Sequence, residues 1–75
     1  MYITDILFES VEDAKNFVNL CNTVPFSVEL VSGAYVIDAK SIMGIFSLDL
    51  SKRIEMHANC GEDDAFVEKI KPFVK

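Results

Sequence analysis

The hydrophobic period of this chain changes repeatedly, from two residues to between three and four and back, and this alternation leaves few possible folds. A period of two is typical of a strand with one buried face, and a period near 3.6 is typical of an amphipathic helix. The chain has 75 residues, a length that can supply one small core. We therefore expect a single domain over residues 1–75, in which short strands and helices share that core.

The first half of the chain predicts a strand, a helix and a β-hairpin. Tyr2–Phe8 is rich in β-branched and aromatic residues, as strands are. Ser10 and Asp13 have capping-box spacing at the start of a helix, and Pro25 ends that helix near Asn22 or Thr23. Its apolar stripe is Val11, Ala14, Phe17, Val18, Cys21 and Val24.

The hairpin follows that helix. Phe26–Leu30 alternates apolar with polar residues, Ser32-Gly33 marks a tight turn, and Ala34–Ile37 forms the returning strand.

The second half predicts a short helix, a fourth strand and a last helix. Ser41 opens a helix that runs through Leu48, and three alternate residues then give a strand one buried face: Ile54, Met56 and Ala58. Acidic residues 62–64 precede the last helix, and Pro72 ends or kinks it. Its inner stripe is Phe66, Val67, Ile70, Phe73 and Val74. The order βαββαβα predicts an α+β fold, with helices on one face of a four-stranded, mainly antiparallel sheet.

The run Asp38–Leu48, with Lys-Ser-Ile-Met-Gly at residues 40–44, resembles the HPr family. Members of this family are the histidine-containing phosphocarriers of the bacterial sugar phosphotransferase system. The resemblance covers roughly the C-terminal two thirds of the chain. It implies an open-faced β-sandwich, and it places Ser41 at the position of a regulatory phosphorylated serine.

The N-terminal third departs from the family motif, which is a glycine, an apolar residue and then His-Ala-Arg-Pro. Here the chain reads Phe-Glu-Ser-Val-Glu-Asp over residues 8–13. Counting back from Ser41 places Ser10 at the histidine position and Glu12 at the arginine position. The family's phosphotransfer needs an imidazole nucleophile and a guanidinium that holds the phosphoryl oxygens. We therefore expect a divergent member that lacks the phosphocarrier histidine, with no catalytic residue and no enzymatic activity.

Two other residues, Ser10 and His57, are candidate phosphate acceptors. Ser10 has no base nearby in sequence and is flanked by carboxylates, so we interpret it as a helix N-cap. His57 is the one histidine and lies on the polar face of the fourth strand, beside Glu55 and Asn59, where we expect a surface residue.

The helix opened by Ser41 is apolar on nearly every side. If Ile45 and Leu48 turn inward, then Ile42, Met43 and Phe46 lie together on the opposite side and form an exposed patch. The resemblance implies that these positions dock partners, and we assign partner binding to Lys40, Ile42, Met43 and Phe46. Two alternatives stay open: Phe46 folds under the helix, or it meets a second copy of the chain.

Composition narrows the classes of partner. Acidic residues outnumber basic ones 12 to 7, and the formal net charge of −5 disfavours nucleic acid and anionic membranes. The N-terminus lacks the pattern of a signal peptide, and no run approaches a membrane span, so we expect a cytoplasmic protein. Cys21 and Cys60 have no metal-ligand spacing, which predicts reduced thiols and no metal or other cofactor.

The sequence is compatible with three functions. The favoured one is a regulatory or adaptor module related to the sugar phosphotransferase system, with Ser41 as its phosphorylation site. Its partners would be an HPr-type serine kinase or a transcriptional regulator. The second is a phosphotransfer protein that uses His57 or Ser10. The third is a structural or dimerisation domain in which Ser41 is only a cap.

Overall fold

A computed structural model describes all of residues 1–75. The elements in chain order are β1 (Tyr2–Ile6), α1 (Val11–Cys21), β2 (Val28–Ser32), β3 (Tyr35–Asp38), α2 (Ile42–Phe46), β4 (Ile54–Ala58), α3 (Ala65–Lys69) and the 3₁₀-helix η1 (Lys71–Phe73). The predicted order βαββαβα is confirmed. None of the helices combines the length and the apolar character that crossing a membrane requires.

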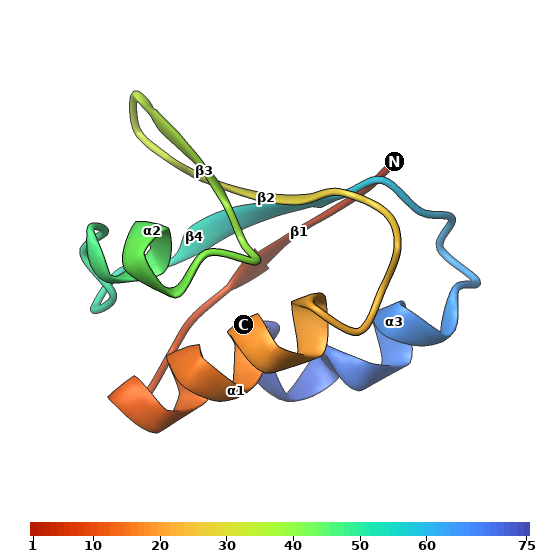
Figure 1. Cartoon of the computed structure of the whole chain (residues 1–75), viewed down its shortest axis with the longest axis horizontal. Coiled ribbons are helices and arrows are strands. Elements are labelled where there is room, and N and C mark those ends of the chain that lie inside the picture. The colour runs from red at the N-terminus through yellow and green to blue at the C-terminus, as the bar shows by residue number, and fades with distance from the viewer.

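The four strands form one sheet in the order β1-β4-β2-β3, and every neighbouring pair is antiparallel. Figure 1 shows α1 and α3 beneath one face of this sheet, with α2 at its β3 end, while the opposite face carries no helix. The α+β architecture with helices on one face is confirmed. We call the uncovered side of the sheet the open face.

The core lies between the sheet and the helices, where the sequence periods placed it. Ile54, Met56 and Ala58 of β4 are fully buried, as their alternation predicted. Beneath them, the Phe17 ring of α1 packs edge-on against Phe8 and Phe73, with ring centroids 5.3 Å away in each case. The buried residues of α1 are Ala14, Phe17, Val18 and Cys21, as the apolar stripe predicted. The prediction was wrong for Val11, which lies in the first turn and is 58% exposed.

The two strand boundaries at aromatic residues differ from the prediction. β1 ends at Ile6 instead of Phe8, because the Leu7 amide donates to the Phe73 carbonyl at 2.9 Å and Phe8 then turns into the core. β2 begins at Val28 instead of Phe26, and the Phe26 ring packs edge-on against Phe66 at 5.4 Å. In both places an aromatic side chain reaches the core from a loop.

The helix cap at Ser10 and the turn at Gly33 form where the sequence predicted them. Ser10 is the N-cap of α1, and its Oγ accepts from the Asp13 amide at 3.1 Å. The Asp13 carboxylate accepts in turn from the Glu9 amide at 3.1 Å, so the capping box closes one residue earlier than usual. Gly33 has φ 60 at the first position of a two-residue turn between Ser32 and Tyr35, a conformation that favours glycine.

Candidate docking surface at the Ser41 helix

Ser41 begins α2 by local hydrogen bonding. Its backbone is extended (φ −99, ψ 112), and its Oγ accepts from the Gly44 amide at 3.1 Å. Its carbonyl accepts from the Ile45 amide at 3.1 Å, and its own amide donates to the Asp38 carbonyl at 3.0 Å. Ser41 is therefore the N-cap that joins the end of β3 to α2, and its side chain is half-buried.

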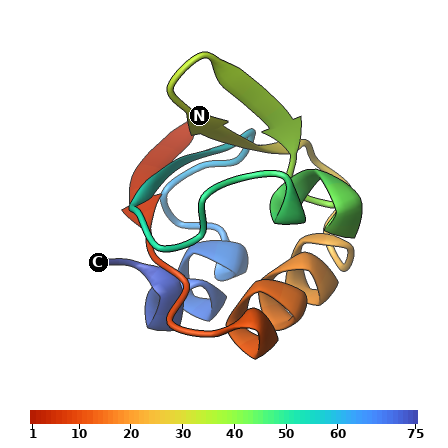
Figure 2. The ribbon, with the colours of Figure 1, turned by 90° about the vertical axis from the view of Figure 1, so that its left-hand side faces the viewer.

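Three apolar side chains of α2 face solvent. Ile45 is fully buried and Leu48 packs against the core, so the inward turn that the spacing suggested is present. Ile42, Met43 and Phe46 are 37%, 80% and 41% exposed. We call these three residues the α2 patch. Figure 2 shows α2 between β3 and α1, with its outer side free of any other element.

Lys40 has a structural contact that the sequence did not reveal. Its ammonium group donates to the Val24 carbonyl at 2.9 Å, just beyond the end of α1. Its carbonyl accepts from Asn22 Nδ2 at 3.1 Å, and its amide donates to Asp38 Oδ1 at 2.9 Å. Lys40 thus joins the start of α2 to the C-terminal end of α1, where a cation is favoured by the helix dipole.

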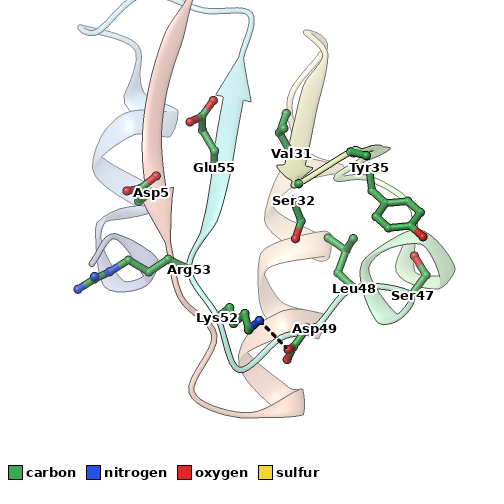
Figure 3. A pocket seen from close by; sticks show the side chains of 12 residues that line it. Asp5, Val31, Ser32, Tyr35, Ser47, Leu48, Asp49, Lys52, Arg53 and Glu55 are labelled. Carbon is green, nitrogen blue, oxygen red and sulfur yellow. Dashed lines mark ion pairs between the residues drawn. The ribbon is translucent and has the colours of Figure 1, made fainter.

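Tyr35 lies next to this surface, although the helical spacing that predicts the α2 patch does not include it. Its side chain is 69% exposed, and Figure 3 shows it beside Ser47, the residue that follows α2. Both residues line a cleft of about 600 Å³ between the hairpin tip and the loop from α2 to β4. A signal existed in the sequence: Tyr35 alternates with Ile37, which packs against the core, so both residues point to the α2 side of the sheet.

The same cleft is lined by charged residues. The Lys52 ammonium group lies 4.0 Å from the Asp49 carboxylate, and both side chains are largely exposed. The pKa of Asp49 is lowered by its hydrogen bonds from the Ser51 side chain and backbone. Exposed pairs of this kind contribute little to stability.

The other two candidate residues lie outside this surface. The Ser10 hydroxyl is occupied as an N-cap, as predicted. His57 lies in the middle of β4 on the open face, opposite Ile3 of β1 and Glu29 of β2. Its Nε2 is hydrogen-bonded to the Glu55 carboxylate. No hydrogen bond joins either residue to Ser41.

The thiols are free, as expected from their spacing. Burial raises the pKa of Cys21 to about 12, so this residue is a neutral thiol at physiological pH. Desolvation also raises the pKa of Cys60. No three side chains among His, Cys, Asp and Glu come close enough together to hold a metal ion.

The comparisons with known proteins agree with this geometry. The family model described as "PTS HPr component phosphorylation site" matches residues 11–75. The HPr-C-His structure from Thermoanaerobacter tengcongensis superposes with a TM-score of 0.79 at 20% identity, covering 99% of this chain and 91% of that one. The phosphocarrier protein HPr from Bacillus anthracis str. Ames gives a TM-score of 0.76 at 20% identity, covering 99% and 94%. No curated protein matched the sequence. The chain belongs to the HPr family of the phosphotransferase system.

Proposed function

We propose that this HPr-family chain is a regulatory or adaptor module, a binding protein and not an enzyme, which docks protein partners through the α2 patch. The observation that carries the proposal is the exposure of Ile42, Met43 and Phe46 directly beside the Ser41 cap. So short a helix with three exposed apolar side chains is typical of an interaction surface. HPr-type serine kinases and transcriptional regulators are the partner classes that the family suggests.

The surroundings of His57 in β4 and of Ser10 at the start of α1 both argue against a phosphocarrier role. The only histidine is His57, in mid-strand, without the helix N-terminus and cations that hold a phosphoryl group. Its Nε2 already bonds a carboxylate, which would repel an incoming phosphate. At the start of α1, the Glu9 carboxylate is ion-paired with the Lys75 ammonium group at 2.8 Å. The Asp13 carboxylate accepts from the Glu9 amide, so one of the amides beside Ser10 is already occupied.

Phosphorylation of Ser41 supplies the proposed regulation. A phosphoryl group on Oγ adds about −1.5 to −2 charge and several acceptor oxygens. That charge would stand next to the amides of the first turn of α2, where an anion is tolerated. It would also stand at the edge of the α2 patch, so partners that cover the patch with apolar groups should lose affinity. Partners that offer arginine should gain it.

The dimerisation alternative uses the same patch with a different occupant. If a second copy covers Ile42, Met43 and Phe46, the purified chain will be a dimer whose dissociation is promoted by Met43→Asp. Sizing in solution separates the two: the adaptor role predicts that the pure chain is monomeric.

The test is a pull-down of native lysate on the immobilised chain, with quantified recovery of each captured protein. We expect Met43→Asp to lose the partners that wild type captures. Val11→Asp is the matched control, because Val11 is also an exposed apolar residue in the first turn of a helix, at 58%. Equal losses in both variants, or none in Met43→Asp, would exclude the α2 patch as the docking surface.

The proposed regulation by phosphorylation of Ser41 is tested separately. The chain is incubated with ATP and an HPr-type serine kinase, the modified residue is mapped, and partner binding is compared between the two forms. We expect label on Ser41, none in Ser41→Ala, and an altered set of partners. Label on another residue, or label on Ser41 with unchanged binding and stability, would leave Ser41 as a helix cap.

A further inference from the structure

The open face of the sheet is strongly acidic. The strand alternation that buries Ile54, Met56 and Ala58 directs Glu55 and His57 to the open face, together with their partners on the neighbouring strands. Four carboxylates consequently share this face, one from each strand: Asp5 of β1, Glu55 of β4, Glu29 of β2 and Asp38 of β3. Figure 1 shows no helix on this side of the sheet.

These carboxylates oppose one another in register. Asp5 pairs directly with Glu55, and Glu29 pairs directly with Asp38. Figure 3 shows the first pair, on adjacent strands. Like charges placed directly opposite across a sheet destabilise it, and an antiparallel sheet exposed to water can equally well carry threonine or opposite charges there. Two such pairs in a four-stranded sheet are a local departure from the arrangement that stability favours.

The protein's own cations leave most of this charge uncompensated. His57 bonds Glu55, but Asp5, Glu29 and Asp38 form no ion pair. The nearest lysine in sequence, Lys40, directs its ammonium group to the Val24 carbonyl. Arg53, which precedes β4, lines the same cleft as Asp5 and Glu55 but forms no ion pair with either.

The open face also offers apolar contact and a receptive shape. Ile3 is 53% exposed and Val36 is 59% exposed, on the two edge strands. A hollow of about 350 Å³ is lined by Glu29, Val36 and Asp38, and also by Lys40, whose ammonium group donates to the Val24 carbonyl. A cationic side chain in this hollow would lie beside two carboxylates that form no ion pair. This combination suits a partner surface whose lysines or arginines flank short apolar side chains.

We propose that the open face is a second docking surface, whose occupant is a basic polypeptide segment of a partner protein. A second copy of the chain does not fit, because it would bring the same four carboxylates against these four. Nucleic acid and anionic lipid are repelled for the same reason. This surface lies on the opposite side of β3 from α2, and the proposal is independent of the function proposed for Ser41.

The probe for this surface is a synthetic peptide of alternating lysine and valine, titrated into the isotope-labelled chain and followed by amide chemical shifts. We expect shifts on the open-face strands, with affinity that weakens steeply as salt rises from low concentration to ~0.3 M. The double variant Glu29→Gln/Asp38→Asn should bind at least roughly tenfold more weakly.

The matched control is Glu12→Gln/Glu62→Gln, which removes the same net charge from exposed positions outside the sheet. It should change affinity less than about twofold, an effect of net charge alone. Glu29→Gln should also raise the melting temperature, because it removes one like-charge pair. Shifts centred on the helices, equal weakening in both double variants, or no binding of the peptide would each overturn the proposal. Met43→Asp should leave peptide binding unchanged, so this result is separable from the fate of the α2 patch.

Discussion

Truncating matched residues inside and outside the core gives the sharpest test of the α2 patch. The chain supplies two such pairs: Met43 is 80% exposed while Met56 is fully buried, and Phe46 is 41% exposed while Phe66 is 1% exposed. Changing each residue to alanine removes the same atoms within a pair. Any large difference in the free energy of unfolding therefore reports mainly burial, because the propensity of alanine for a helix or a strand changes that free energy by at most about 1 kcal/mol.

The expected magnitudes follow from those exposures. Met56→Ala should cost about 2–5 kcal/mol, because it leaves a cavity under the sheet, whereas Met43→Ala should stay within about 0.5 kcal/mol. Phe66→Ala should cost about 3–5 kcal/mol. Phe46→Ala should cost roughly 1–2 kcal/mol, because only part of the ring is covered and water fills the space that it leaves.

The assay is thermal and urea unfolding followed by circular dichroism at one protein concentration. For a domain of this size, about 1 kcal/mol corresponds to a shift of about 4–8 °C in melting temperature. Met43→Ala should therefore shift the midpoint by less than about 4 °C, and Met56→Ala should lower it by at least about 8 °C or prevent folding. If Met43→Ala lowered the midpoint as much as Met56→Ala, the methionine would be a core residue, and the docking surface would not exist as described.

Three further predictions concern phosphate, capping and the buried thiol. Phosphoenolpyruvate and the general enzyme of the sugar phosphotransferase system should place no acid-labile phosphate on the chain; stoichiometric label that disappears in His57→Ala would contradict this. Ser41→Ala and Ser10→Ala should each lower the free energy of unfolding by about 1 kcal/mol in urea titrations, because each leaves one helix amide without its acceptor; losses below about 0.3 kcal/mol would show that water replaces the cap. Because burial raises the pKa of Cys21 from 9.0 to about 12, only the unfolded chain loses this proton in that range, so stability should fall as the pH rises from about 9 toward 12. Urea unfolding at several pH values should show a weaker fall in Cys21→Ala, and an identical fall would assign it to other groups.

The elements predicted best are those whose signal is local. The alternation in residues 54–58 gave both the strand and its buried face, and the stripe of α1 gave four of its buried residues. The caps at Ser10 and Ser41 depend on hydrogen bonds three residues along the chain, a spacing that is visible in the sequence. Helical spacing likewise placed Ile45 inward and Met43 outward.

The features that the sequence did not predict depend on contacts between distant residues. The strand order β1-β4-β2-β3 brings residues 2–6 beside residues 54–58, and no local pattern encodes that pairing. The Leu7 amide bonds the Phe73 carbonyl, which ends β1 early. The Lys40 ammonium group donates to the Val24 carbonyl, 16 residues away in sequence. A lysine that we assign to partner binding therefore also links the start of α2 to the end of α1.

The two proposed surfaces differ in how they relate to stability. The α2 patch has little effect on the free energy of unfolding, because an exposed residue such as Met43 can be apolar or charged without changing the core. The open face opposes Asp5 to Glu55 and Glu29 to Asp38, so it lowers the stability of the free chain, and a basic occupant would remove that repulsion. Binding of a basic segment at the open face should therefore raise the melting temperature, and it should raise it less in Glu29→Gln/Asp38→Asn, which binds the segment more weakly. Because the two surfaces share no residue, the effects of Met43→Asp and Glu29→Gln on stability should add. A clear departure from additivity in the double variant would mean that β3 and α2 do not contribute independently to stability.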